Sequence, residues 1–153
     1  MRIAAAFAFT VFAIITTPAG AATVESLFQE FGLFGNWAFD CSQPPSLTAN
    51  NTHASFTKRS DGVVVEDMNP GPGLDVSHYT ILSAERLSDT QLSMEAIFQP
   101  GTAYEQRFSQ VLLISNATWR QMFSKMGDRV GVKDGIVVFP PNGRPTPVWN
   151  KCK

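Results

Sequence analysis

Residues 91–98, QLSMEAIF, decide the fold class of this chain. Leu92, Met94, Ala96 and Phe98 alternate with residues that are mostly polar. Successive side chains of a β-strand point to opposite faces, so this alternation is typical of a strand that buries one face. We therefore expect 91–98 to form a strand with one side against a hydrophobic core.

Comparable short runs of strand-forming residues occur on both sides of this segment. They lie at 37–41, 55–58, 63–65, 76–83, 104–114, 118–123, 130–132 and 136–139. Asp61-Gly62 and Asp134-Gly135 each separate two such runs, and this dipeptide favours a hairpin because both turn residues need positive φ. The pattern predicts an all-β fold, an antiparallel up-and-down meander of about eight or nine short strands that closes into a barrel.

One short helix is expected before the strands. Leu27, Phe28 and Phe31 recur at helical spacing, Thr23 stands where an N-cap is needed, and Gly32 can end the helix.

The two cysteines, Cys41 and Cys152, lie near the two ends of the predicted barrel domain. Closing the meander would remove its unpaired edges and bring the first strand beside the last, so a disulfide is expected. A reactive thiol is the alternative, but no C-x-x-C motif is present. An even strand count would place the two cysteines at opposite ends. We therefore expect either an odd count or a Pro-rich tail, 140–147, that folds back along the barrel, and favour the tail because proline cannot continue a central strand.

The N-terminus has the layout of a secretory signal peptide. Met1-Arg2 is a short positive region, 3–15 is an apolar run, and Ala19-Gly20-Ala21 fits a cleavage site. An uncleaved membrane anchor is the alternative, but the apolar run is shorter than the roughly 20 residues that a span needs. We expect a signal peptide at 1–21 and a single barrel-like domain at 22–153, periplasmic or secreted and with no membrane attachment after cleavage.

Composition and motifs exclude several function classes. With 12 Lys+Arg against 13 Asp+Glu and 44% hydrophobic residues, the chain is neither a disordered protein nor a nucleic-acid binder. His53 and His78 lack metal-ligand spacing, so no metal and no cofactor is expected. No G-x-S-x-G motif occurs, so we expect no catalytic residues and no enzyme, unless His78 and a carboxylate converge in a cleft.

Aromatic residues remain the strongest functional signal. Side chains that could point into the barrel are Trp37, Phe39, Phe56, Phe98, Tyr104, Phe108 and Phe123. Two readings stay open, because such residues either fill a small barrel or line a cavity for one small ligand. Gln106 and Gln110 share a strand face with Phe108, so they either orient a ligand or lie at a solvated rim. The candidate ligand-binding residues are Trp37, Phe39, Phe98, Gln106, Phe108 and Gln110.

Two resemblances support this hypothesis. Gly35-Asn36-Trp37, which follows the expected helix, resembles the G-x-W opening of lipocalins and their calycin relatives. That resemblance implies a lipocalin-like eight-stranded barrel holding an apolar ligand. Residues 35–44 also match G-x-W-x-x-D-C-S-x-P, and 146–152 carry a T-P-…-K-C ending with Trp149. Both motifs are similar to those of small uncharacterised exported bacterial proteins, which implies pairing of the cysteines and supplies no activity.

The favoured hypothesis is therefore a non-enzymatic binder of a small apolar or amphipathic ligand. The alternative is a periplasmic protein-interaction or inhibitor module with a protein partner. It would act through two Pro- or Gly-rich loops, at 42–51 and 69–73.

Overall fold

The computed structural model describes residues 22–140 and 143–153, and the expected signal peptide lies outside the described residues. One helix and ten strands occur in these ranges. They are α1 Val24–Glu30, β1 Gly35–Ala38, β2 His53–Lys58, β3 Val64–Asn69, β4 Ser77–Arg86, β5 Gln91–Phe98, β6 Gln106–Ser115, β7 Thr118–Met126, β8 Arg129–Lys133, β9 Ile136–Val137 and β10 Trp149–Lys151.

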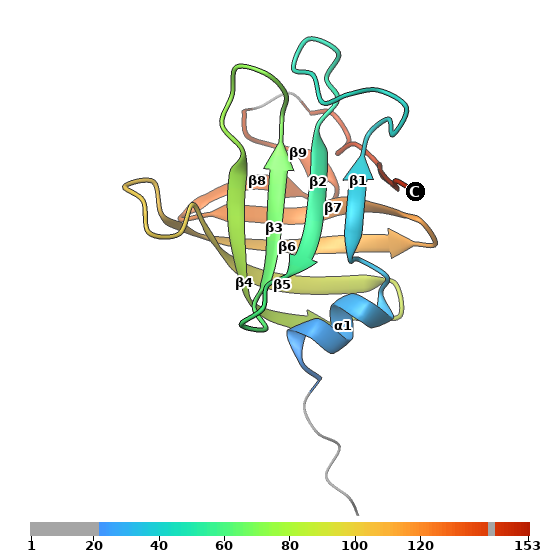
Figure 1. Ribbon diagram of the computed structural model, residues 1–153, viewed down its shortest axis with the longest axis vertical. Coiled ribbons are helices and arrows are strands. Elements are labelled where there is room, and N and C mark those ends of the chain that lie inside the picture. Colours follow the sequence, from blue (N-terminus) through green and yellow to red (C-terminus); the bar gives the residue numbers. More distant parts are fainter. Residues whose placement is uncertain (1–21, 141–142) are drawn as a thin grey trace, which may run out of the picture.

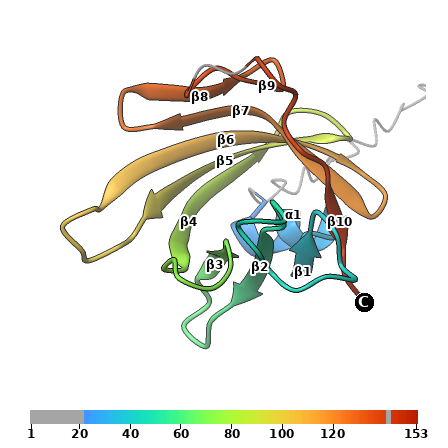
Figure 2. The ribbon, with the colours of Figure 1, turned by 90° about the horizontal axis from the view of Figure 1, so that it is seen from above.

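Eight of these strands form a closed antiparallel barrel (Figure 1). Strands β1 to β7 follow one another as a meander, and β10 pairs with both β7 and β1 to complete the ring. Figure 2, seen from above, shows β10 reaching across from the side of β8 and β9 to lie beside β1. Strands β8 and β9 extend the sheet outside the ring. The expected all-β barrel with one short helix is confirmed.

Strand β7 can close the barrel because its two halves have different partners. Thr118 and Trp119 pair with β10, whereas Ser124 and Met126 pair with β8. The first half of β7 is therefore connected to β1 through β10. The second half pairs with β8, which forms a hairpin with β9 outside the ring.

A register shift in β7 reverses which residues face inward. Val111 pairs with Phe123 and Leu112 pairs with Gln121, so Met122 is an extra residue between the two pairs. A bulge of this kind changes the face on which the following side chains lie. Phe123 consequently shares the outer face with Val111, and the expectation that it points inward is wrong.

The expected inward position of Tyr104 is also wrong, because this side chain is 74% exposed. Strand β6 begins only at Gln106, and the preceding connection turns through Gln99 and Gly101, both at positive φ. Tyr104 therefore lies in a turn and not in the strand.

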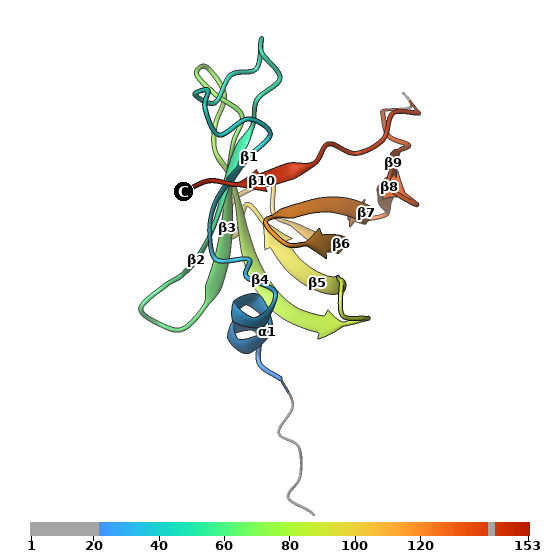
Figure 3. The same cartoon turned by 90° about the vertical axis from the view of Figure 1, so that its right-hand side faces the viewer.

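Helix α1 covers one end of the barrel (Figure 3). Thr23 caps it as expected, because its hydroxyl oxygen accepts a hydrogen bond from the Ser26 amide at 3.1 Å. Phe28 is fully buried and packs edge-on against Phe56, with ring centroids 5.4 Å apart. The interior is therefore sealed at this end by a packed hydrophobic cluster.

The disulfide between Cys41 and Cys152 is present, with Cα atoms 5.4 Å apart, so the expected pairing is confirmed. The barrel ring is even-numbered, and the tail does fold back: the Thr146 hydroxyl donates to the Gln121 carbonyl of β7 at 2.7 Å. Closure also needs a turn after β1, where the Asp40 carboxylate accepts hydrogen bonds from the amide and hydroxyl of Ser42. This turn directs Cys41 back toward β10.

No helix within 22–140 or 143–153 combines the length and apolarity needed to cross a lipid bilayer.

Candidate functional site

The barrel contains an inner cavity of about 290 Å³. At about 30 Å³ per water molecule, this equals the volume of about ten waters. Strands β3, β4, β6, β7 and β10 supply most of its wall. The lining residues are Phe39, Glu66, Met68, Tyr79, Phe108, Gln110, Trp119, Gln121, Ser124, Thr146, Pro147 and Trp149. The wall thus combines aromatic rings with a small number of polar groups, as is typical of ligand cavities.

The aromatic part of the wall is held together by ring contacts between distant strands. Trp149 of β10 stacks on Trp119 of β7, with centroids 4.8 Å apart and planes 11° apart. Phe39 packs edge-on against Trp149 at 4.4 Å, and Phe108 lies 5.1 Å from Tyr79. Closure of the barrel by β10 therefore completes this wall, because β10 brings Trp149 beside Trp119.

The polar part of the wall is a chain of hydrogen bonds that ends at Glu66. Gln121 Nε2 donates to Gln110 Oε1 at 2.6 Å, and Gln110 Nε2 donates to Glu66 Oε2 at 3.3 Å. Glu66 and Gln110 are each only 2% exposed. The Gln110 amide thus presents its oxygen to Gln121 and its N–H donor to the Glu66 carboxyl group.

Burial in this apolar setting raises the pKa of Glu66 from its ordinary 4.5 to about 8. The hydrogen bond from Gln110 lowers the pKa by a smaller amount, and the negative charge of Asp67 raises it slightly. Burial, and then the proximity of Glu66, also raise the pKa of Tyr79. Among the described residues that line the cavity there is no Lys, Arg or His, so Glu66 has no counter-ion there.

Trp119, which lines the cavity, carries a polar group that the described residues leave unsatisfied. Its indole N–H is buried and finds no acceptor within the described residues. Trp37 provides the contrast, because its indole N–H donates to the Leu33 carbonyl at 2.7 Å. A buried donor without an acceptor destabilises a fold by about 1–3 kcal/mol. A buried polar group of this kind needs an explanation, and Trp119 is itself a residue of the cavity wall.

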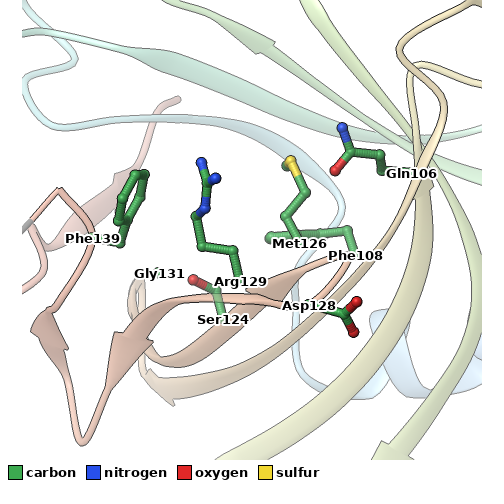
Figure 4. Close-up of a pocket in the computed structure, with 8 residues that line it drawn as sticks. All are labelled: Gln106, Phe108, Ser124, Met126, Asp128, Arg129, Gly131 and Phe139. Atoms are coloured by element: carbon green, nitrogen blue, oxygen red, sulfur yellow. The ribbon is translucent and has the colours of Figure 1, made fainter.

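A second, more open hollow of about 760 Å³ adjoins the inner cavity (Figure 4). It is lined by Gln106, Phe108, Ser124, Met126, Asp128, Arg129, Gly131 and Phe139. Phe108 and Ser124 line both spaces, so they form the neck between them. In Figure 4 Arg129 rises beside Phe139, and its guanidinium carbon lies 4.3 Å from the centre of that ring. The outer hollow, which adjoins the inner cavity, is therefore lined by both polar and aromatic side chains.

Gly131, which lines the outer hollow, lies close to the Ser124 side chain. A Cβ atom on Gly131 would lie 3.1 Å from the Ser124 hydroxyl oxygen, which is tighter than an ordinary contact. A side chain at this position would require the Ser124 hydroxyl to shift by a few tenths of an ångström.

The six expected ligand-binding residues divide into three groups. Phe39, Phe108 and Gln110 line the inner cavity, while Gln106 is exposed and lines the outer hollow. Trp37 and Phe98 line neither space. Trp37 is fully buried within the hydrophobic core, and Phe98 packs half-buried against Tyr79, with ring centroids 5.2 Å apart.

The hydrophobic pattern did not predict the buried carboxyl group of the cavity wall, Glu66. The run Val63-Val64-Val65 reads as continuously apolar and obscures the alternation of β3, in which Val64, Glu66 and Met68 share the inner face. Alternation counted along the strand from the Asp61-Gly62 turn would have placed Glu66 on the inner face of the barrel. Trp119 and Trp149 had no such signal, because their inward position depends on how β10 closes the ring.

Neither His53 nor His78 lines the inner cavity or the outer hollow. His78 Nδ1 lies 2.7 Å from an Asp67 carboxylate oxygen, so a carboxylate does reach His78. Both side chains are exposed on the outer face of the sheet, at 56% and 43%, and line neither hollow. Within 22–140 and 143–153, no three His, Cys, Asp or Glu side chains cluster as metal ligands would.

The loops at 42–51 and 69–73 pack against each other. Asn51 is almost fully buried, and its side-chain amide donates to three backbone carbonyls. Gly71 lies so close to Ser46 that a Cβ atom would approach the Ser46 Cα to 2.8 Å. Leu47, in one loop, and Leu74, directly after the other, are 62% and 51% exposed. The two loops thus form one fixed surface with apolar tips.

Comparison of the chain with models of protein families, with curated proteins and with solved structures found no match. The function is therefore argued from the cavity and its residues.

Proposed function

We propose that this protein is an exported, non-enzymatic β-barrel that binds a small apolar or amphipathic molecule in the inner cavity. The single observation that carries the proposal is the cavity itself, an aromatic space inside the barrel with a buried polar chain ending at Glu66. A barrel that served only as a scaffold would gain stability by filling this space with apolar side chains. A buried carboxyl with a raised pKa and an indole N–H without an acceptor are both costs that binding would offset.

The size and lining of the cavity define the ligand in outline. A volume of about 290 Å³ suits a molecule with on the order of ten to fifteen non-hydrogen atoms. Phe39, Phe108 and Trp149 would contact its apolar part, while Glu66 and Trp119 would engage its polar atoms. The molecule would enter past Phe108 and Ser124 from the outer hollow.

Export is proposed from two features that agree with each other. The N-terminal segment has the layout of a signal peptide, and the barrel contains a disulfide between Cys41 and Cys152. Disulfides of this structural kind persist in oxidising compartments. The likeness to exported proteins with the G-x-W opening supports the same location, periplasmic or secreted.

Native mass spectrometry of protein recovered from its own host tests the binding proposal. We expect a complex whose extra mass corresponds to one small molecule, and its loss from a Ser124→Phe variant, in which the added ring fills the neck. The matched control is Ser109→Phe, because Ser109 lies on β6 with its side chain outside the barrel. Wild-type protein that carries no small molecule and binds none from an extract of its host would refute the proposal.

One observation favours a second candidate function, a protein-interaction or inhibitor module. Leu47 and Leu74 present exposed apolar side chains at two loops, one of which is hydrogen-bonded by Asn51 and which approach each other closely at Gly71. Pull-down from the exporting host with wild type and with a Leu47→Ser, Leu74→Ser double variant tests it. A partner retained equally by both proteins would exclude these loops as the contact.

A further inference from the structure

We propose that the ligand of the inner cavity is a small organic cation, a protonated or quaternary amine on an apolar skeleton, whose charge lies against the Glu66 carboxyl and the surrounding rings. This inference rests on the proposed function and specifies the ligand's chemical class.

The hydrogen-bond chain in the cavity wall runs toward the Glu66 carboxyl group. Gln121 donates to Gln110, and Gln110 in turn donates to Glu66, so the chain presents Glu66 as its terminal acceptor. The described residues offer the carboxyl no other hydrogen bond. The remaining lone pairs of Glu66 are therefore available to a donor that the ligand brings, and an ammonium group supplies donors and no acceptor.

Glu66 has no positively charged partner among the described residues that line the cavity. Within the described part of the chain, the groups that pair with Glu66 across the sheet or connect to it through Gln110 come from four strands, and the only ionisable one is Tyr79. They are Phe56 from β2, Tyr79 from β4, Met94 from β5 through its contact with Gln110, and Gln110 from β6. Asp67 is adjacent in β3 but points to the outer face, where it binds His78. Arg129 lines only the outer hollow, where it lies over the Phe139 ring.

The cavity wall is rich in aromatic side chains. Five of the residues that line the cavity are aromatic: Phe39, Tyr79, Phe108, Trp119 and Trp149. The faces of such rings attract cations, and the attraction is strongest where water is excluded. The cavity thus offers a positively charged ligand a buried carboxyl group and several aromatic rings, with no Lys, Arg or His among the described lining residues.

Binding of a cation would be linked to release of a proton. In the free protein at neutral pH the raised pKa keeps Glu66 protonated. When the cation binds, the carboxyl loses its proton to solvent and the carboxylate pairs with the ammonium group, so one positive charge enters and one proton leaves. Affinity should therefore rise with pH up to the pKa of Glu66 and then level off.

Isothermal titration calorimetry with benzylamine and benzyl alcohol tests this inference, because the two probes have the same size and differ in charge. At about pH 7 we expect benzylamine to bind at least about tenfold more tightly, with close to one proton released per molecule bound. Its affinity should rise by up to about tenfold between about pH 6 and about pH 7. Titration in two buffers of different ionisation enthalpy measures the proton release directly.

The variant Glu66→Gln should lose the preference for benzylamine, whereas Glu95→Gln should keep it. Glu95 lies on the outer face of β5, between the buried residues Met94 and Ala96, so Glu95→Gln makes the same glutamate-to-glutamine exchange outside the barrel. Equal affinity for the two probes in wild type, or binding of benzylamine without proton release, would overturn the inference and leave the proposed cavity function standing. Failure of both probes to bind would count against the inference and the proposed function together.

Discussion

The strongest prediction concerns the pH dependence of stability and the substitution Glu66→Gln. The folded protein holds a proton on Glu66 up to about pH 8, whereas the unfolded chain releases it near the ordinary pKa of 4.5. Between these values the folded state binds more protons than the unfolded state. The free energy of unfolding must then fall as the pH rises through this window, and level off above it.

The magnitude follows from the width of the window. Each pH unit changes the free energy of unfolding by about 1.4 kcal/mol, so the full window is worth about 5 kcal/mol. Glutamine has nearly the same shape as a protonated glutamic acid and does not titrate. We therefore expect Glu66→Gln and wild type to differ little at about pH 5, and the variant to be more stable by about 3 kcal/mol or more at about pH 7.5.

Urea unfolding followed by tryptophan fluorescence at several pH values measures this difference. Other titrating groups act equally in both proteins, so the difference between the two curves isolates Glu66. The variant Glu95→Gln serves as the control and should run parallel to wild type. A difference between wild type and Glu66→Gln that does not change with pH would refute the claim that Glu66 is buried and protonated.

Three further predictions concern the scaffold. Replacing Cys41 and Cys152 by alanine should lower the free energy of unfolding by up to about 5 kcal/mol, because the link closes a loop of 111 residues; chemical denaturation of the two proteins measures it. Thr23→Ala should reduce stability by about 1 kcal/mol through loss of the cap on α1, seen as a lower thermal midpoint. Gly71→Ala should destabilise more than Gly73→Ala, since both glycines have positive φ but only Gly71 is pressed against the neighbouring loop; equal thermal shifts would contradict this contact.

The parts of the fold that local sequence determines were predicted well. Strand β5 spans 91–98, as its alternation indicated, and the Asp61-Gly62 and Asp134-Gly135 turns separate β2 from β3 and β8 from β9. The cap at Thr23 has the same origin. Each of these features depends on residues within a few positions of one another. The local sequence pattern is therefore enough to predict the strand, the two turns and the helix cap.

The cavity could be predicted only in part, because it depends on contacts between distant strands. Phe39, Phe108 and Gln110 were predicted from alternation alone. Trp149 reaches the cavity only because β10 enters the gap between β7 and β1. The bulge at Met122 carries no sequence signal that we recognise, and it alone decides that Ser124 faces inward in place of Phe123.

The most direct test of the account follows the indole N–H signals of the three tryptophans by nitrogen-15 NMR during titration with benzyl alcohol and then benzylamine. If the inner cavity takes the ligand, the Trp119 signal shifts, because Trp119 lines the cavity and its N–H has no acceptor among the described residues. The Trp37 signal stays in place, because Trp37 does not line the cavity and its N–H is bonded to the Leu33 carbonyl. A Trp119 signal that does not move at saturating concentrations of either probe would contradict the account.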